Sequence, residues 1–195
     1  MGYNRNGSNN GTGRTRNWAT IIYPESAPAD WEERLREAKV QAVASPPHDQ
    51  DTNPTGEPKK THRHVILRFD QVKTQEQAEE VFALIGGVGC EKVKDLRQYC
   101  RYLCHLDNPE KAQYAPGDAI TFGGFDYYEV IMSAADEADM LREITFFITD
   151  HHVTNFAQFQ RWNAEHRPDW FRLIAKSGSY YVAQLIKSER YNVEE

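Results

Sequence analysis

Apolar and polar residues alternate in two different rhythms along the first two thirds of the chain. Short β-branched or aromatic runs predict strands, and apolar positions three or four residues apart predict helices. The expected elements are a strand at 18–23, a helix at 30–38, strands at 40–45 and 61–69, a helix at 74–85, a strand at 90–94 and a helix at 95–105. This β-α-β-β-α-β-α order favours an α+β fold in which helices cover one face of a small antiparallel sheet, as in split βαβ units.

The two ends of the chain have a different character from the middle. Residues 1–16 are rich in Gly and Asn and predict a flexible basic arm, which either hangs free or touches DNA. The Gly-rich, aromatic stretch 115–131 suggests a loop or a final hairpin. Ser133 and Asp136 resemble a capping box, and helical patterns follow at 134–150, 155–165 and 179–190. We therefore expect three parts: an arm (1–16), an α+β domain (17–131) and a small all-α C-terminal domain (132–195).

Composition narrows the class of protein. A net charge of −6 excludes a uniformly basic nucleic-acid binder but leaves room for a local basic patch. Three cysteines suit reduced thiols better than a disulfide framework. The chain contains no apolar run of the roughly 18 residues that a membrane span needs and begins with no hydrophobic signal region. We expect a cytoplasmic protein without a membrane partner.

Two histidines one residue apart, His62 and His64, open the predicted strand at 61–69. Residues i and i+2 of a strand share a face, so both imidazoles project on one side, with Ile66 beyond them. Val65 and Leu67 then point the other way, into a core. Two imidazoles on one rigid face supply half of a metal site.

The other half is expected in the loop after the second strand, Ser45-Pro46-Pro47-His48-Asp49-Gln50-Asp51. It adds an imidazole, His48, and two carboxylates, Asp49 and Asp51, between which the sequence does not choose. Mixed imidazole and carboxylate ligands suit Mn²⁺, Mg²⁺, Co²⁺ or Zn²⁺ and lack the thiolates of most structural zinc sites.

The helix predicted at 95–105 carries two tyrosines. At 100° per residue, Leu96, Cys100, Leu103 and Cys104 form one apolar arc. Tyr99 lies near the edge of that arc and is the better candidate for packing, whereas Tyr102 faces away from its centre and suits a cleft. A phenol can attack a phosphodiester that a divalent cation activates, and the covalent phosphotyrosine keeps the bond energy for later rejoining.

These motifs resemble the HUH endonucleases, and within them the rolling-circle plasmid replication initiators of the RepB-like (Rep type 2) group. The resemblance covers about residues 17–131, and its carrying segments are Tyr23-Pro24-Glu25-Ser26, Asp30-Trp31, Ser45 to Asp51, His62-Arg63-His64-Val65 and Tyr99 to His105.

The resemblance implies a ferredoxin-like antiparallel sheet with flanking helices. It implies a divalent metal, most often Mn²⁺, and Tyr102 as the nucleophile, with Tyr99 as the alternative because some relatives carry paired tyrosines. The implied metal ligands are His48, Asp51, His62 and His64. It also implies that residues 132–195 form an oligomerisation domain, and that the chain acts in the bacterial cytoplasm.

The activity implied is that of a site-specific nickase and strand transferase. It binds the double-strand origin of a plasmid, nicks one strand through a 5′-phosphotyrosine intermediate, leaves a 3′-OH primer and later rejoins the strands. Nicking needs an unpaired target strand, such as a hairpin loop. The sequence has no phosphate loop of the Gly-x-x-x-x-Gly-Lys-Ser/Thr type, so unwinding would depend on a host helicase, with a host polymerase extending the primer.

DNA contacts must come from local positive charge, which makes phosphate binding salt-dependent. The expected contacts lie in the N-terminal arm, beside the metal loop and along the tyrosine helix: Arg14, Arg16, Lys59, Lys60, Arg97 and Arg101. Arg63 points to the face opposite the histidines and is a weaker candidate for the same phosphate.

Three other functions stay open at this point. A ferredoxin-like nucleic-acid-binding module would need no metal, and the His and Asp set argues against it. A mobilisation relaxase or single-strand transposase would share the chemistry, although relaxases are usually longer. A metallohydrolase that uses water would leave Tyr102 without a role.

Overall fold

A computed structural model describes residues 13–53 and 55–193, which leaves most of the predicted arm outside the described residues. The chain divides into two compact units, Met1–Ile131 and Met132–Glu195. The elements of the first unit are β1 (Thr15–Ile22), α1 (Trp31–Glu37), β2 (Gln41–Ala44), β3 (Arg63–Lys73), α2 (Gln75–Leu84), β4 (Val88–Lys92), α3 (Leu96–Tyr102), a 3-10 turn (Pro116–Asp118), β5 (Ile120–Phe122) and α4 (Tyr127–Ile131).

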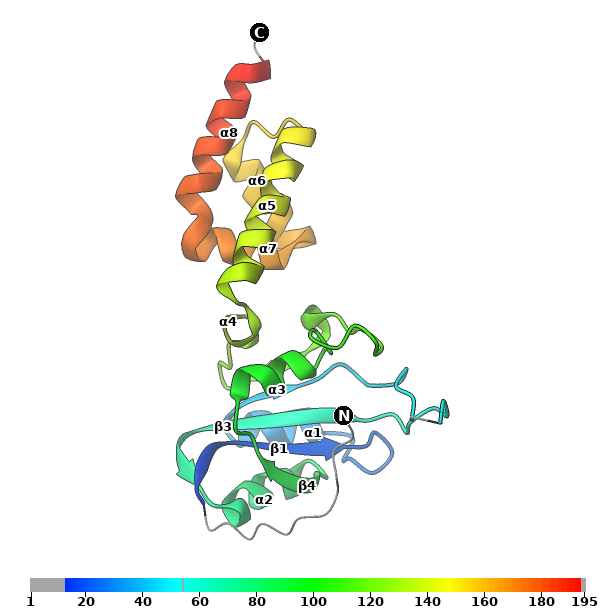
Figure 1. The fold of residues 1–195 in the computed structure, drawn as a ribbon. Coiled ribbons are helices and arrows are strands. Elements are labelled where there is room, and N and C mark those ends of the chain that lie inside the picture. Colours follow the sequence, from blue (N-terminus) through cyan, green and yellow to red (C-terminus); the bar gives the residue numbers. More distant parts are fainter. Residues whose placement is uncertain (1–12, 54, 194–195) are drawn as a thin grey trace. The chain divides into compact units, whose positions relative to one another are not determined.

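The first unit is built on one antiparallel sheet with the strand order β4-β1-β3-β2-β5. Figure 1 shows three of these strands, β4, β1 and β3, next to one another. The long strand β3 lies in the middle and pairs with β1 on one side and with β2 on the other. Its register sets Leu67 opposite Trp18 and Ala42. The α+β fold with an antiparallel sheet and flanking helices is confirmed, and the 115–131 stretch supplies the fifth strand.

The two faces of the sheet have different coverings. On one face Val65, Leu67 and Phe69 of β3 are buried and form the core with residues of α1 and α2, such as Leu35 and Phe82. This part of the prediction is confirmed. The helices do not all share that face, however, because α3 lies on the other side, where its tyrosines contact the ring of His64. The pattern of α3 alone could not reveal this, since its apolar arc fits either face.

Several element boundaries differ from the prediction. β1 begins at Thr15, so Arg16 lies in a strand and its Nε donates a hydrogen bond to the Phe69 carbonyl (2.9 Å). α3 begins as predicted with Asp95, whose side chain accepts from the Gln98 amide, but it ends at Tyr102. The chain then turns, and His105 has a positive φ of 56°, which no helix residue adopts.

The second unit is helical. It contains α5 (Ala134–Asp150), α6 (Phe156–His166), α7 (Pro168–Leu173), a π-helical turn (Ile174–Gly178) and α8 (Ser179–Val193). The Ser133–Asp136 capping box is present, as predicted. A local core forms around Ile144, Ile148 and Trp170, and Phe147, Phe156, Phe159 and Trp162 pack in it. Within the described ranges, the helices are all too short or too polar to cross a bilayer.

Two glycines in the turn after β5 test how closely this turn packs against the backbone at Val40, just before β2. Gly123 (φ +59°) and Gly124 (φ +75°) both have left-handed backbones, but a Cβ on Gly123 would lie 2.4 Å from the Val40 carbonyl oxygen, whereas one on Gly124 would meet nothing within 4 Å. Gly124→Ala should therefore cost only the conformational penalty, about 1–2 kcal/mol. Gly123→Ala should cost clearly more in the free energy of unfolding, measured with urea. Equal losses for the two variants would contradict the close approach.

Candidate active site

Three histidines lie together on the sheet face that carries α3. His48 comes from the loop after β2, His62 immediately precedes β3, and His64 is its second residue. The ring centroids are 5.3 Å (His48–His62), 5.1 Å (His48–His64) and 5.1 Å (His62–His64) apart. All three side chains are buried, and one ligand nitrogen from each lies within 4.8 Å of the others. We call this group the histidine triad.

Backbone pairing holds the triad in place. The loop after β2 continues the β2–β3 ladder, because the Ser45 amide donates to the His64 carbonyl (2.9 Å) and the His48 amide donates to the His62 carbonyl (2.8 Å). The Ser45 hydroxyl also accepts from the His64 amide (3.0 Å). The spacing of the three imidazoles therefore follows from sheet register.

Backbone carbonyls also determine which ring nitrogen carries a proton. His48 Nε2 lies 2.9 Å from the Leu103 carbonyl, and His62 Nδ1 lies 2.8 Å from the Lys60 carbonyl. A carbonyl only accepts, so these nitrogens donate, and the other nitrogen of each ring keeps its lone pair. Such orientation by carbonyls is the usual arrangement of histidines that ligate a metal.

Burial favours the neutral form of two of these imidazoles, those of His48 and His64. Desolvation lowers the pKa of His48 to about 4, and it also lowers the pKa of His64 well below the usual value. The Nδ1 atoms of His48 and His64 are buried and have no hydrogen-bond partner among the described residues. Buried lone pairs without a donor are costly unless something fills them. The donor set therefore fits a divalent cation.

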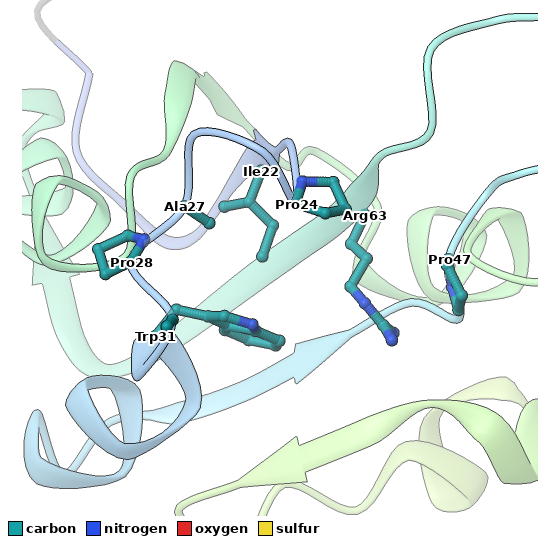
Figure 2. A pocket seen from close by; sticks show the side chains of 8 residues that line it. Ile22, Pro24, Ala27, Pro28, Trp31, Pro47 and Arg63 are labelled. Atoms are coloured by element: carbon teal, nitrogen blue, oxygen red, sulfur yellow. The ribbon is translucent and has the colours of Figure 1, made fainter.

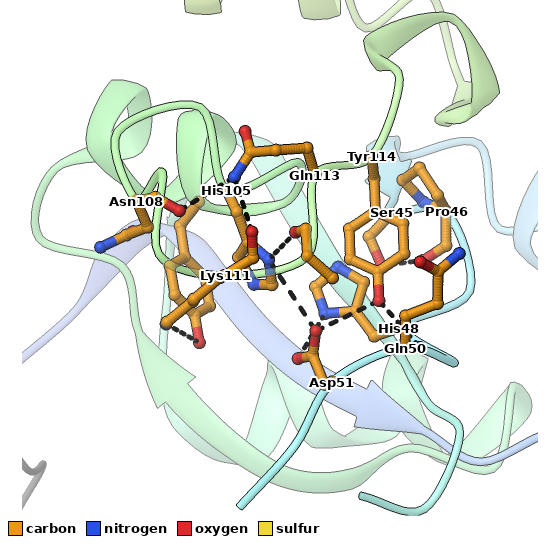
Figure 3. Close-up of polar contacts among 12 residues, drawn as sticks. Ser45, Pro46, His48, Gln50, Asp51, His105, Asn108, Lys111, Gln113 and Tyr114 are labelled. Carbon is orange, nitrogen blue, oxygen red and sulfur yellow. Dashed lines mark hydrogen bonds and ion pairs between the residues drawn. The ribbon is translucent and has the colours of Figure 1, made fainter. Parts of the chain in front are cut away.

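The structure separates the two candidate carboxylates. Asp49 is exposed, whereas Asp51 is buried, with Oδ2 at 3.5 Å from His48 Nδ1 (Figure 3). Asp51 forms a second possible metal-binding group with His48 and His105, so it shares only His48 with the histidine triad. The four predicted ligands thus lie close together but belong to two groups that share His48: the histidine triad, and the group that contains Asp51 and His105.

Sequence reasoning missed two residues that support Asp51. The Tyr114 hydroxyl donates to Asp51 Oδ1 (3.1 Å), and its ring stacks on His48 with centroids 4.5 Å apart. His105 is fully buried and donates from Nδ1 to the Ala112 carbonyl (2.7 Å). Its ring centroid is 4.8 Å from that of His48. The position of His105 three residues after Tyr102 was a usable signal. No spacing connects Tyr114 with this loop.

Tyr102 lies beside the triad. Its ring centroid is 5.6 Å from that of His64. Lys111, another residue that the sequence analysis did not single out, holds its ammonium 4.5 Å above the Tyr102 ring and donates to the hydroxyl at 3.4 Å. The phenol oxygen thus has a positive charge next to it.

Tyr99, the alternative nucleophile, has a different environment. Its hydroxyl donates to the Glu91 carboxylate of β4 at 2.5 Å, and its ring centroid is 6.3 Å from that of His64. The hydrogen bond to Glu91 therefore holds the Tyr99 hydroxyl against β4. The geometry therefore favours Tyr102 over Tyr99 as the group that faces the triad.

The predicted DNA-contacting residues differ in how far they are engaged within the protein. Arg101 is bound to the Asp107 carboxylate and to the Ile131 carbonyl, which gives it a structural role. Arg97 also reaches the Ile131 carbonyl, at 3.5 Å. Lys60 pairs with Glu25. Arg14 is exposed and Lys59 is half-buried.

Comparisons with known proteins identify the family. The profile described as "Plasmid replication protein, origin binding domain" matches residues 10–128, and the one described as "Replication protein RepB, C-terminal" matches residues 134–191. The chain is 35% identical over 178 residues to a "Replication protein RepB" of Lactiplantibacillus plantarum, covering 90% of this chain and 81% of the relative. It is 32% identical over 180 residues to a "Replication protein" of Staphylococcus aureus, covering 91% and 90%. The chain therefore belongs to the RepB-like family of plasmid replication initiators, and its first unit is an origin-binding domain.

Proposed function

We propose that this initiator nicks one strand of its plasmid origin by attack of Tyr102 on a phosphodiester. The single observation that carries the proposal is the position of the Tyr102 ring, whose centroid is 5.6 Å from that of His64 in the buried histidine triad. A nucleophile beside a set of metal-ligating nitrogens is the arrangement that metal-assisted phosphoryl transfer requires.

The histidine triad, His48, His62 and His64, would hold a divalent cation, with Asp51 as the carboxylate ligand. The family resemblance makes Mn²⁺ the first choice, and the mixed imidazole and carboxylate ligands also suit Mg²⁺, Co²⁺ and Zn²⁺. The bound ion supplies Lewis-acid polarisation of a phosphoryl oxygen. The protein's part is to bury the imidazoles and to orient two of them, His48 through the Leu103 carbonyl and His62 through the Lys60 carbonyl.

The chemical step then follows from the residues themselves. The Tyr102 phenol oxygen attacks the scissile phosphorus and loses its proton. The bond between phosphorus and the 3′ oxygen breaks, and that oxygen takes up a proton to become the 3′-OH primer. Lys111 keeps the phenol oriented and places positive charge where the phosphate approaches. Because a phosphotyrosine replaces the phosphodiester, the reverse reaction can rejoin a strand.

Two further functions complete the proposal. Lys59, Lys60 and the arginines at 14, 16, 97 and 101 are the candidate phosphate contacts, with a host helicase and a host polymerase acting on the nicked origin. The helical unit would form a homo-oligomer. Its exposed apolar side chains support this, since Phe146, Phe171, Tyr180, Tyr181 and Tyr191 each expose 40% or more of their surface.

The nucleophile is tested by matched tyrosine variants. Tyr102→Phe removes the attacking oxygen and should abolish Mn²⁺-dependent nicking of supercoiled origin plasmid, together with the covalent protein–5′-phosphate adduct. Tyr99→Phe loses the bond to Glu91 but keeps the Tyr102 hydroxyl, and should retain nicking within a few-fold. Nicked plasmid is separated from supercoiled plasmid on a gel. The covalent adduct is detected as protein that stays attached to the 5′ end of the nicked strand until protease digests it. If Tyr99→Phe is the inactive variant, the assignment is reversed, and if both variants nick, the covalent mechanism is wrong.

The metal site is tested by titrating Mn²⁺ into the protein and measuring free ion by electron paramagnetic resonance. Asp51→Asn and His62→Gln each remove a proposed ligand and should weaken Mn²⁺ binding by at least about tenfold. Asp49→Asn and His151→Gln are the controls, because both residues are exposed, and should bind normally. Normal Mn²⁺ binding by Asp51→Asn would remove that carboxylate from the ligand set.

Self-association is tested by sedimentation velocity. Replacing Phe146 and Tyr180 together by Ser removes two of the most exposed apolar side chains, 59% and 80% exposed, and should shift the protein to smaller species. Val72→Ser, at a 48% exposed position in the first unit, serves as the control and should not change the distribution. A monomeric wild-type protein would contradict the oligomer proposal directly.

A further inference from the structure

A pocket of about 300 Å³ lies where β1 ends and β3 begins (Figure 2). Its lining is mostly apolar and includes Ile22, Pro24, Pro28, Trp31 and Pro47, with the guanidinium of Arg63 as the charged group. An open pocket of this size, lined by apolar side chains and one guanidinium, can accommodate a small planar group.

Arg63 is the polar group that defines what the pocket can bind. It lies between His62 and His64 in the strand, so its side chain points to the opposite face of the sheet. Among the described residues its guanidinium hydrogen-bonds to the Ser45 carbonyl (2.5 Å) and to no other group. A guanidinium has five N–H donors, so the bond to Ser45 leaves others available to a ligand in the pocket that Arg63 lines. Burial lowers the pKa of Arg63, yet the group stays charged.

The pocket is close to the candidate active site along the chain. Pro47 precedes His48, and Arg63 separates the two histidines of β3. Tyr23, next to Pro24, lies between the two regions, with its ring centroid 6.2 Å from that of His62. The Lys60 ammonium lies 4.4 Å from the Tyr23 ring. An aromatic ring and a cation thus lie near the start of β3, close to both the triad and the pocket, which suits the path of a single nucleic-acid strand.

We propose that this pocket receives one unpaired base of the origin strand close to the scissile phosphate. The occupant is a guanine, whose O6 and N7 acceptors match the two-pronged guanidinium of Arg63, while Trp31 and the prolines contact the base. The proposal rests on the proposed function, because it needs the strand to pass the Tyr102 site. It makes Arg63 a residue that selects the base and takes no part in the chemistry.

The test uses binding of a fluorescent single-stranded oligonucleotide that spans the nick site, followed by anisotropy. A set of oligonucleotides carries one abasic position each. The protein is the Tyr102→Phe variant, which keeps the DNA intact. The oligonucleotide should bind about tenfold more weakly when the base is removed at one particular guanine position, as expected for one stacked and hydrogen-bonded base. Arg63→Gln should weaken binding of the intact strand but cause no further loss at that same abasic position.

Two matched variants separate base recognition from general charge. Arg34→Gln removes an exposed arginine of α1 that pairs with Asp30 outside the pocket lining, and its effect should be the same on every oligonucleotide. Arg63→Lys keeps the charge without the fork and should also lose the preference for guanine. Thermal unfolding of each variant checks that the fold is retained.

The outcomes are distinct for the two proposals. The pocket proposal is overturned if Arg63→Gln weakens every oligonucleotide equally or if no abasic position depends on Arg63. Nicking of the intact oligonucleotide by the wild-type protein is measured in parallel. If the wild-type protein nicks the oligonucleotide but no base position depends on Arg63, the pocket proposal is wrong and the nickase proposal stands. If one base position depends on Arg63 but no nicking occurs, the nickase proposal is wrong and base recognition by the pocket stands.

Discussion

The alternation of side chains along β3 is the constraint on which the rest of this structure depends. His62 and His64 face α3, whereas Arg63, Val65 and Leu67 face the other side, where Val65 and Leu67 join the main core. β3 is paired on both sides, so its register is held by β1 and β2 at once. A slip of one residue would exchange the faces and put two imidazoles into the apolar core. The geometry of the histidine triad and the stability of the sheet are therefore set by the same ladder.

Burying imidazoles is costly, and the fold offsets the cost with backbone carbonyls. His48, His62 and His105 each donate to one, from Leu103, Lys60 and Ala112 respectively. The bond from His48 to Leu103 has a second consequence. Leu103 directly follows Tyr102, so the same hydrogen bond that orients a proposed ligand also anchors the end of α3. The distance between the triad and the candidate nucleophile therefore depends both on the register of the sheet and on this one buried hydrogen bond.

The order of strands and helices could be predicted because each element carries its own periodic pattern, and the buried face of β3 follows from it. The capping residues Asp95 and Ser133 were equally local signals. The side of the sheet that α3 covers was not predicted, because an apolar arc of Cys100 and Leu103 can pack on either face. Lys111 and Tyr114 escaped notice for a related reason: they reach Tyr102 and Asp51 only after the chain turns at His105.

The sequence by itself determined the fold class, the pair of imidazoles on one face of a strand, and the residue types available for chemistry, since period-two alternation and side-chain chemistry are local properties. Only the tertiary structure decided the rest. It brought His48 against His62 by extending a ladder beyond β2, buried Asp51 while leaving Asp49 exposed, and set Lys111 over Tyr102. These are contacts between segments that are distant in sequence, and their geometry depends on sheet register and on loop paths that no single segment encodes.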